Sequence, residues 1–596
     1  MKNLQAKTLE HLSVVLCNWL LASCSPSIVK VKVQIDKPEA IKEAISATVV
    51  TKRSRFSSPS TGPSSSRIVP YSSSTSSSSS SSGVLKVIHD IEPATGVERR
   101  TIFELSGLDF CAPPRLQLPT KSTKPITPIS ELCYIAIGTN LGQRSRNICT
   151  AIERIGEIAN VRHISFLYET PAAYVTDQPP FLNCAISVDT SLSPQEMLTQ
   201  LKRIEHEMGR KPTIRFGPRL IDLDIITMGQ TTVDQPDLFV PHASMHERAF
   251  VLVPLLDICP QNYVHPKLGK TLATLFHSLP RPDILDVRKV IPVPMRDGTE
   301  TCILVDERAP TRLFGILNVT PDSFSDGGKH LEPSVAKQAA MKMRTSDAKV
   351  IIDIGGETTK PDSVPVTADE ELSRIVPVIT AIVDHFKVEQ LEGSQLLSID
   401  TNKVEVARKA AELGCNILND VYAASRFYSD RSAQEAMIEL VKTTRMPWVM
   451  LHCRGTSQTM NQSSQFDDGR VVQQIAEEML PVIKCALSQG VMPWQIIVDP
   501  GIGFAKRGNQ NVEICRHLSE FKSRVGRFPL LVGASRKRFL GTIIEREQEK
   551  PESRDAASLA LVPHFISSGA NFIRVHDVAS TRDVVTVHEY IVDKTH

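Results

Sequence analysis

The stretch Gly315-Ile-Leu-Asn-Val-Thr-Pro-Asp-Ser-Phe-Ser-Asp-Gly-Gly328 joins an apolar segment to a polar loop that ends in glycine. Ile316 and Leu317 favour a buried strand, and Asn318 is the first polar side chain after them. The prolyl and glycyl dipeptides that follow are typical of turns. The stretch therefore predicts a strand whose carboxyl end opens into a loop that carries candidate ligands.

The same pattern recurs seven times further along the chain. Each copy is a short apolar run that ends in one or two polar residues and precedes a stretch with helical periodicity. The runs cover residues 350–357, 396–401, 417–421, 448–452, 496–501, 530–535 and 572–578. With the first strand they make eight βα units, which predicts a C-terminal (β/α)8 TIM barrel over residues 310–596.

In such a barrel the carboxyl ends of all the strands meet at one face, where active sites lie. Nine polar residues at these ends are therefore predicted to share one site: Asn318, Glu357, Asp400, Asn419, His452, Asp499, Lys537, Arg574 and His576. The carboxylates and amides suit a heterocycle with several N–H donors, whereas the cationic side chains suit phosphate or pyrophosphate. Solvated strand ends would explain any one of these residues but explain the whole set poorly.

Length and composition set broad limits. A chain of 596 residues is too long for one core, so several domains are expected in an α/β multidomain protein. The net charge of +2 gives no reason to expect nucleic acid or membrane as a partner, and favours small-molecule substrates. The 12 cysteines form no C-x-x-C pair, which indicates a reducing compartment and buried apolar thiols. Without a secretory signal or transmembrane pattern, a cytoplasmic or mitochondrial location is predicted.

The segment before the barrel divides into three parts. Residues 1–55 predict a helix at 8–21, a strand at 29–35 and a second strand near 47–50. Residues 56–130 begin with a serine-rich run that cannot bury a core, and they are interpreted as a linker and extension. Residues 131–290 alternate strands and helices less regularly than the barrel, which predicts an α+β ferredoxin-like domain. Its strands are expected at 163–168, 181–189 and 222–228, and its helices at 144–158, 193–208 and 243–256. Residues 283–309 carry an alternating strand pair that is expected to cap the closed end of the barrel.

The chemistry of residues 131–290 lies in Gly209-Arg-Lys-Pro-Thr-Ile-Arg-Phe-Gly-Pro-Arg-Leu-Ile-Asp-Leu-Asp224. Asp222 and Asp224 are two apart in a predicted strand, so their carboxylates share one face and repel unless a cation lies between them. Mg²⁺ suits such a pair because phosphate oxygens complete its shell. Arg210, Arg215 and Arg219 add forked positive charge. The stretch therefore predicts phosphoryl-type transfer.

This domain resembles 6-hydroxymethyl-7,8-dihydropterin pyrophosphokinase through Ala136-Ile-Gly-Thr-Asn-Leu141, Gly217-Pro-Arg-Leu-Ile-Asp-Leu-Asp224 and Val240-Pro-His-Ala-Ser-Met-His-Glu-Arg-Ala-Phe250. The resemblance implies that Asp222 and Asp224 bind magnesium and that Arg210 and Arg219 hold the triphosphate. It assigns ATP to Glu205, Arg215, His242 and Arg248, and the pterin to Thr170, Pro171, Phe181, Asn183 and Phe250. Phe216 departs from the family, which commonly has tryptophan there, and the arginine-rich loop is one residue shorter than in bacterial members.

The barrel resembles dihydropteroate synthase through its first stretch and through Asp353-Ile-Gly-Gly-Glu-Thr-Thr359, Ser398-Ile-Asp-Thr401, Asp499-Pro-Gly501, Gly533-Ala-Ser-Arg-Lys537 and Ile573-Arg-Val-His-Asp577. The resemblance implies that the pterin is bound by Asp400, Asn419, Asp499 and Lys537. It gives pyrophosphate and Mg²⁺ to Asn318, Arg574 and His576, and it places p-aminobenzoate against Thr359, Phe504 and Ser535. Lys360 stands where the family usually has arginine, which predicts modestly altered handling of pyrophosphate or p-aminobenzoate.

The implied reaction expels pyrophosphate from the hydroxymethyl carbon of the pterin and leaves a cation beside Asp400, which the amine of p-aminobenzoate attacks. The first domain would make the ester that the second consumes, as in fungal folic acid synthesis proteins. The resemblance further implies a homodimer through the barrel and inhibition by sulfonamides. Residues 1–55 resemble the last half of a dihydroneopterin aldolase, with Lys37 as the catalytic lysine and Glu10 as the pterin anchor, but without the first half no activity is expected.

Two other interpretations fit part of the pattern. A pterin-binding methyltransferase barrel shares the fold and the pterin carboxylates but has no pyrophosphate to bind. A catalytically silent pterin-binding scaffold would be marked by loss of Asp222, Asp224 or Asp400, and all three residues are present.

Overall fold

The computed structural model describes residues 131–592 apart from 174, 212–213, 215, 261, 321–331, 345–348, 361 and 391–394, together with the backbone of four short strands nearer the N-terminus. The predicted helix at 8–21, Glu10, Lys37, the serine-rich run and Arg215 lie outside the described residues. Among the helices in the described part of the chain, none is both long and apolar enough to cross a membrane.

Met1–Cys111 form a unit of their own. Its strands are β1 (Val33–Gln34), β2 (Ala47–Val49), β3 (Val84–Ile91) and β4 (Glu98–Ser106), which form an antiparallel sheet in the order β1-β2-β4-β3. The two strands predicted within residues 1–55 are present in shorter form. The β3–β4 hairpin was not predicted, and its pairing with β2 joins part of the expected extension to the first segment.

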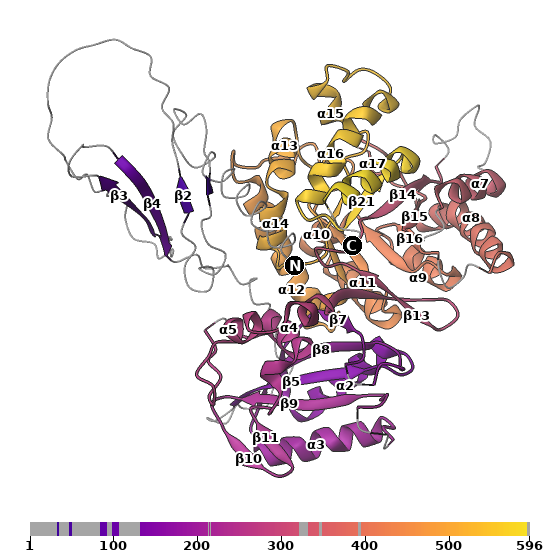
Figure 1. Cartoon of the computed structure of the whole chain (residues 1–596). Coiled ribbons are helices and arrows are strands. Elements are labelled where there is room, and N and C mark those ends of the chain that lie inside the picture. The colour runs from indigo at the N-terminus through magenta and orange to yellow at the C-terminus, as the bar shows by residue number, and fades with distance from the viewer. Residues whose placement is uncertain are drawn as a thin grey trace, which may run out of the picture. The chain divides into compact units, whose positions relative to one another are not determined.

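The second unit begins with a seven-stranded sheet whose main path runs β13-β12-β7-β8-β5-β9, with β6 also paired to β8 (Figure 1). The strands are β5 (Glu131–Thr139), β6 (Asn160–Ile164), β7 (Leu167–Thr170), β8 (Phe181–Thr190), β9 (Asp222–Met228), β12 (Arg288–Pro294) and β13 (Glu300–Leu304). Helices α2 (Arg144–Ile158) and α3 (Pro194–Glu207) bury apolar side chains in one core with alternate residues of β5, whereas α4 (Ala249–Ile258) packs in another. The smaller elements are β10 (Val233–Gln235), β11 (Leu238–Val240), η2 (Met245–Glu247), α5 (Leu272–His277) and α6 (Arg281–Leu285).

Two predicted elements of this domain are divided in the structure. In place of one strand at 163–168, β6 ends at Ile164 and β7 begins at Leu167. The break lies at Ser165, because its hydroxyl donates to the Phe166 carbonyl and accepts from the backbone N–H of Ala185. The helix expected at 243–256 is split at Arg248, whose backbone is extended, into η2 and α4. The bounds of α2 and β9 agree with the prediction.

The rest of the chain forms the predicted barrel (Figure 1). Its parallel strands are β14 (Arg312–Asn318), β15 (Val350–Gly355), β16 (Leu397–Asp400), β17 (Ile417–Asp420), β18 (Trp448–Leu451), β19 (Ile496–Asp499), β20 (Leu531–Val532) and β21 (Phe572–Val575). They follow the order β19-β18-β17-β16-β15-β14-β21-β20, and a single parallel bridge between Val498 and Leu530 closes the ring.

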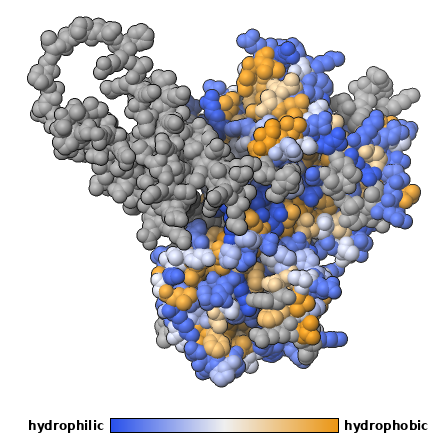
Figure 2. Space-filling model, viewed as in Figure 1, coloured by the Kyte–Doolittle hydropathy of each residue, from blue (hydrophilic) through white to orange (hydrophobic). Residues whose placement is uncertain are grey.

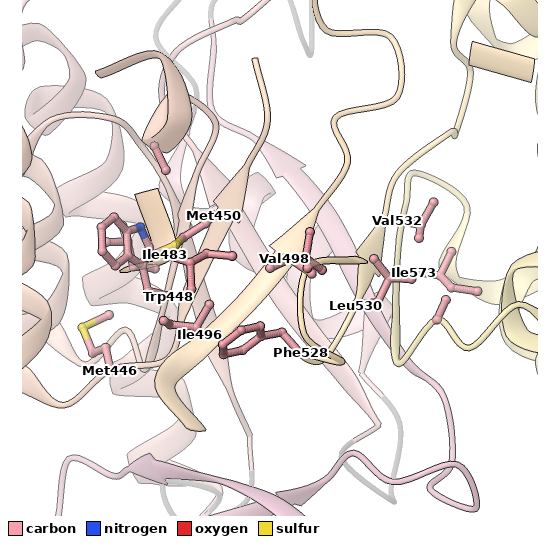
Figure 3. Close-up of a cluster of buried hydrophobic side chains, with 14 of the residues drawn as sticks. Met446, Trp448, Met450, Ile483, Ile496, Val498, Phe528, Leu530, Val532 and Ile573 are labelled. Atoms are coloured by element: carbon pink, nitrogen blue, oxygen red, sulfur yellow. The ribbon is translucent and has the colours of Figure 1, made fainter. Parts of the chain in front are cut away.

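Helices surround these strands and bury their outward side chains. They are α7 (Pro333–Met343), α8 (Ala368–Val388), α9 (Val404–Leu413), α10 (Ala423–Ser429), α11 (Arg431–Thr444), α12 (Val471–Ser488), α13 (Asn509–Arg516), α14 (Leu518–Arg524), α15 (Arg538–Ile543), α16 (Asp555–Ser567) and α17 (Val578–Ile591), with the short turns η3 (Pro493–Gln495) and η4 (Pro551–Arg554). Figure 3 shows part of this core, where Trp448, Ile496 and Phe528 lie among apolar side chains of neighbouring strands. The apolar strand residues that predicted the barrel are thus its buried layer.

The β12–β13 hairpin fills the barrel end opposite the predicted site, as the alternating pattern of residues 283–309 indicated. Ile291, Val293 and Ile303 belong to one buried cluster with residues from near the amino ends of the barrel strands, including Phe314 and Phe572. The same hairpin extends the first domain's sheet, because β12 pairs with β7. One element therefore contributes to both cores.

Two candidate active sites

The first candidate site is a cleft beside β9 that holds about 360 Å³ of open space. Asp222 and Asp224 lie opposite Gly138 and Ala136 of β5 in the sheet register. Eleven of the thirteen side chains predicted for this domain line the cleft: Thr170, Pro171, Phe181, Asn183, Arg210, Arg219, Asp222, Asp224, His242, Arg248 and Phe250. The prediction from motifs far apart in sequence thus describes one cavity.

Asp222 lies between two arginines. Its carboxylate accepts from Arg210 at 2.8 Å and from Arg219 at 2.8 Å. Although desolvation raises the pKa of Asp222, Arg219 and Arg210 hold it below its ordinary value. The neighbouring carboxyl behaves in the opposite way, since desolvation and the charge of Asp222 raise the pKa of Asp224.

This pair fits a divalent cation. Two carboxylates share the face of one strand, and the repulsion that raises the pKa of Asp224 is what a cation would relieve. Two carboxylate donors suit Mg²⁺, which takes phosphate oxygens and water at its other positions.

The far side of the cleft is apolar and amide-bearing, as expected for a flat heterocycle. Asn183 donates to the Thr170 hydroxyl at 2.8 Å, which fixes its orientation. A Cβ atom at Gly138 would lie 3.1 Å from Asn183 Oδ1, so glycine leaves room for this amide. The guanidinium of Arg248 lies 5.7 Å from the ring centroid of Phe250.

Glu205 is placed differently from the other predicted ATP residues. It is buried, accepts from the backbone N–H of Leu223 at 2.7 Å, and pairs with Arg210 and Lys202. It therefore lies behind the cleft, where it supports β9 and Arg210. Phe216 lines the cleft with a left-handed backbone, φ 62°, and its carbonyl accepts from Gln178.

The second candidate site lies at the carboxyl end of the barrel and is built around Arg574 of β21. Its guanidinium donates to Asp353 at 2.7 Å and to Asp400 at 2.5 Å. Asn419 donates to the same Asp353 oxygen at 3.0 Å. Desolvation raises the pKa of Asp400 to about 7, because the attraction of Arg574 offsets burial only in part.

Asp499 and Lys537 form the next part of the same end. Asp499 accepts from the backbone N–H of Gly501 at 2.7 Å, and desolvation raises its pKa to about 6. The Lys537 ammonium lies 4.0 Å from the ring centroid of Phe504, and desolvation lowers the pKa of Lys537 to about 8. The two cations thus come from the adjacent strands β20 and β21, and the carboxylates come from β15, β16 and β19.

Ser535 and His576 are in direct contact. Ser535 Oγ lies 3.0 Å from His576 Nδ1 and accepts from the His576 backbone N–H. Desolvation and the nearby cations lower the pKa of His576 to about 3, so its imidazole is neutral at physiological pH. Asn318 ends β14 and Thr359 follows β15, both half-buried.

Two residues of the predicted nine point into other networks. Glu357 pairs with Lys403, which also pairs with the buried Glu371. His452 is fully buried and bonds Glu478 and Lys506. Both residues lie at strand ends, as predicted, but their side chains point away from the Arg574 group.

Asp353 belongs to the site although sequence reasoning did not single it out. It lies in the middle of β15, where all six residues are buried, and its side chain has no exposed area. The available signal was a lone charged residue inside an otherwise apolar strand, since such a charge needs a buried partner.

Comparison with known proteins finds one family for each domain. The family described as 7,8-dihydro-6-hydroxymethylpterin-pyrophosphokinase matches residues 134–260, and the family described as pterin binding enzyme matches residues 314–576. The mitochondrial folate synthesis bifunctional protein of Pisum sativum is 38% identical over 480 residues, which cover 77% of this chain and 89% of the relative. The chain belongs to the bifunctional folate-synthesis enzymes.

Other members agree with this assignment. A folic acid synthesis protein of Pneumocystis carinii is 36% identical over 75% of this chain, which spans 58% of that relative's length. The crystal structure of wild-type Plasmodium falciparum HPPK-DHPS with pterin and p-hydroxybenzoate superposes with a TM-score of 0.60, at 21% identity, over 79% of this chain and 97% of that one. The latter likeness shows the shared fold of the two domains. The resemblance of residues 1–55 to an aldolase stays a prediction.

Proposed function

We propose a set of residues for each of the two reactions of this bifunctional folate-synthesis enzyme. The chain transfers pyrophosphate from ATP to 6-hydroxymethyl-7,8-dihydropterin and condenses the product with p-aminobenzoate to 7,8-dihydropteroate, releasing pyrophosphate. We assign the first reaction to residues 131–290 and the second to residues 310–596. The arrangement that carries the assignment is the pairing of a two-carboxylate, arginine-rich cleft with a barrel mouth where buried carboxylates face Arg574 and Lys537.

In the kinase cleft, Asp222 and Asp224 would hold Mg²⁺, which would neutralise the charge of the nucleotide phosphates. Arg210 and Arg219 already lie beside Asp222, within reach of phosphates bound there. We assign the ATP to this side, with His242 and Arg248 as further contacts. The pterin binds between Phe181 and Phe250, with Asn183 and Thr170 at its polar edge. Positioning and electrostatics then supply most of the catalysis.

In the barrel, Asp400, Asn419, Asp499 and Lys537 bind the pterin. Three acidic and two basic side chains are buried together here, so the group favours added positive charge. They are Asp353, Asp400 and Asp499 with Arg574 and Lys537. This charge excess suits N–H donors of a heterocycle and a cation that forms beside Asp400 when pyrophosphate leaves. The carboxylate of Asp400 stabilises that cation before the amine attacks.

The leaving group and the second substrate have separate places. Arg574 and His576 lie on the β21 side and would bind pyrophosphate, with Asn318 as the side chain that would hold an accompanying Mg²⁺. Thr359, Phe504 and Ser535 would border p-aminobenzoate. Sulfonamides, which imitate this substrate, are proposed inhibitors for the same reason.

A coupled assay tests the assignment. Purified protein with 6-hydroxymethyl-7,8-dihydropterin, ATP, Mg²⁺ and labelled p-aminobenzoate should form AMP and dihydropteroate together. Removing Mg²⁺ with a chelator should stop AMP formation, and adding Mg²⁺ back should restore it. AMP without dihydropteroate would contradict the assignment of the barrel, and the absence of both products would favour a silent pterin-binding scaffold.

The barrel reaction should depend on pH with a maximum between about 7 and about 8. Because burial raises the pKa of Asp400 to about 7 and of Asp499 to about 6, these acceptors protonate as the pH falls through those values. Lys537, whose pKa is lowered to about 8, loses its charge above that pH. The measurement is dihydropteroate formation from supplied pyrophosphate ester across the pH range. A rate that stays constant down to about pH 5 would contradict a role for ionised Asp400.

We further propose that two chains pair through the barrel. Val587, Tyr590 and Ile591 are 60%, 73% and 74% exposed on α17, and their three- and four-residue spacing puts them on one face. Figure 2 shows apolar side chains gathered over the region of α15, α16 and α17. An exposed apolar stripe of this kind is typical of an interface.

Val587→Glu combined with Tyr590→Glu should convert a dimer into a monomer, because burying two carboxylates in an apolar interface is costly. Sedimentation velocity measures the change directly. The control is Val388→Glu, which alters an equally exposed valine at the end of α8 and should leave the dimer intact. A wild-type protein that sediments as a single chain would contradict the proposal.

A cytoplasmic or mitochondrial location remains our proposal. It is supported by the Pisum sativum relative, which is named as a mitochondrial folate synthesis bifunctional protein.

A further inference from the structure

Four polar side chains form a connected chain behind the Phe504 loop of the barrel. Its centre is Lys506, which is only 6% exposed. The Lys506 ammonium lies 3.0 Å from His452 Nδ1, and it donates to the His452 carbonyl at 3.1 Å and to the Phe504 carbonyl at 2.8 Å. A buried lysine needs all three of these acceptors, because a buried ammonium without hydrogen-bond partners would destabilise the fold by the free energy of its desolvation.

His452 also contacts Glu478. Its Nε2 lies 3.0 Å from the Glu478 carboxylate. Because Lys506 donates to Nδ1, the proton of the neutral ring belongs on Nε2, where it is donated to Glu478. Burial and the charge of Lys506 lower the pKa of His452 to about 4, which keeps the ring neutral. Glu478 in turn accepts from Arg454 Nε at 3.0 Å, and the Arg454 guanidinium lies 3.7 Å from the ring centroid of Phe466.

One end of this chain fixes the loop that carries Phe504. The loop packs directly on the end of β18, since a Cβ atom at Gly501 would lie 1.9 Å from the His452 carbonyl oxygen. A Cβ atom at Gly503 would lie 2.9 Å from the Lys537 side chain. The bond from Lys506 to the Phe504 carbonyl therefore sets the place of the ring that lies against the Lys537 ammonium.

The other end of the chain, Arg454, lies in the segment that follows β18, and this segment contacts the loop that carries Thr359. The backbone carbonyl of Ser457 accepts from the Asp362 N–H at 2.8 Å, and its hydroxyl donates to the Ser363 carbonyl at 3.0 Å. Ser363 donates to the Thr358 carbonyl at 2.8 Å. The segment after β18 thus supports the backbone next to Thr359.

We propose that Lys506, His452, Glu478 and Arg454 are positioning residues for p-aminobenzoate, holding the Phe504 and Thr359 loops at a fixed separation. The inference rests on the proposed function, which places this substrate against those two loops. It accounts for His452, which was predicted at the active face but whose side chain turns away from the pterin group. Among the described residues, the four side chains make no hydrogen bond to Asp353, Asp400 or Arg574, although the charge of Lys506 acts to lower the pKa of Asp499.

Lys506→Met tests the inference, since methionine fills the space but makes none of the three bonds. We expect the KM for p-aminobenzoate to rise about tenfold, while the KM for the pyrophosphate ester and the AMP-forming rate change by less than about twofold. The kinase domain of the same chain serves as an internal control of protein quality. The matched control is Lys522→Met, which removes a lysine of α14 that is bonded to Gly569 and Asn571 before β21.

Glu478→Gln provides a second variant if Lys506→Met does not fold. Glutamine keeps the shape and one acceptor oxygen, so the KM for p-aminobenzoate should rise less than in Glu478→Leu, which keeps neither acceptor. An equal loss in the two variants would contradict the chain of hydrogen bonds and overturn the inference. Equal effects of Lys506→Met and Lys522→Met on both substrates would show a general structural role and would also overturn it.

Phe504→Ala distinguishes failure of the inference from failure of the proposed function. If Phe504→Ala raises the KM for p-aminobenzoate and Lys506→Met does not, the positioning role is wrong and the substrate assignment stands. If neither variant changes the KM for p-aminobenzoate, both the assignment of Phe504 and the inference are wrong. A rise of this KM in both variants supports the inference.

Discussion

Replacing Asp222 with asparagine is expected to lower AMP formation by about a thousandfold and leave dihydropteroate formation from supplied ester unchanged. Asp222 is the one carboxylate in the cleft that both Arg210 and Arg219 contact, and it shares its strand face with Asp224. The neutral amide keeps the shape but loses the charge that a divalent cation and the two arginines need. Both the metal affinity and the arginine positions should therefore be affected.

Asp234→Asn is the matched control for this experiment. Asp234 lies in the same domain on β10, its side chain is 76% exposed, and its contact with Lys267 is 3.5 Å long. It should retain wild-type AMP formation. Higher Mg²⁺ should partly restore Asp222→Asn, because weakened affinity can be offset by concentration. A fall of less than about tenfold in AMP formation would show that Asp222 does not hold the metal.

The fold was predictable because its signals are local. Eight apolar runs with polar ends specify a barrel, since each run is short, buried and followed by a helix. The spacing of Asp222 and Asp224 likewise needs only the alternation of side chains along β9. The pairing of β4 with β2 was missed because β2 lies far back in the sequence, and pairing between distant segments leaves no local pattern.

The site was predictable in position but not in side-chain direction. The sequence placed Glu205 near the kinase cleft and His452 at the carboxyl end of β18. Each side chain nevertheless points toward buried partners from other elements. Asp353 shows the reverse case. It becomes part of the site only because Arg574, 221 residues away in sequence, reaches it across the barrel end. Hydrogen bonds of this kind depend on the closed ring, so no single segment reveals them.

The second large effect is expected at Arg574, because one guanidinium there serves two carboxylates. Arg574→Met should lower dihydropteroate formation from supplied ester by about a thousandfold. The charge that we propose binds pyrophosphate is lost, and Asp353 and Asp400 are left buried without their cation. An uncompensated buried charge also costs about 3–5 kcal/mol of stability, so the unfolding temperature should fall. AMP formation by the first domain should persist wherever the protein remains folded.

Arg574→Lys separates the catalytic effect from the loss of stability. Lysine keeps the positive charge but cannot donate to Asp353 and Asp400 at once in the fixed geometry of the guanidinium. The variant should fold and still lose most of its activity, whereas Arg524→Lys on α14, which alters an exposed i,i+4 pair with Glu520, should have no effect. Because Arg574 holds down the pKa of Asp400, which is already about 7, weakening the contact should move the acidic limb of the rate profile to higher pH. A wild-type profile in Arg574→Lys would mean that the guanidinium does not control the ionisation of Asp400, and full activity would show that pyrophosphate is bound elsewhere.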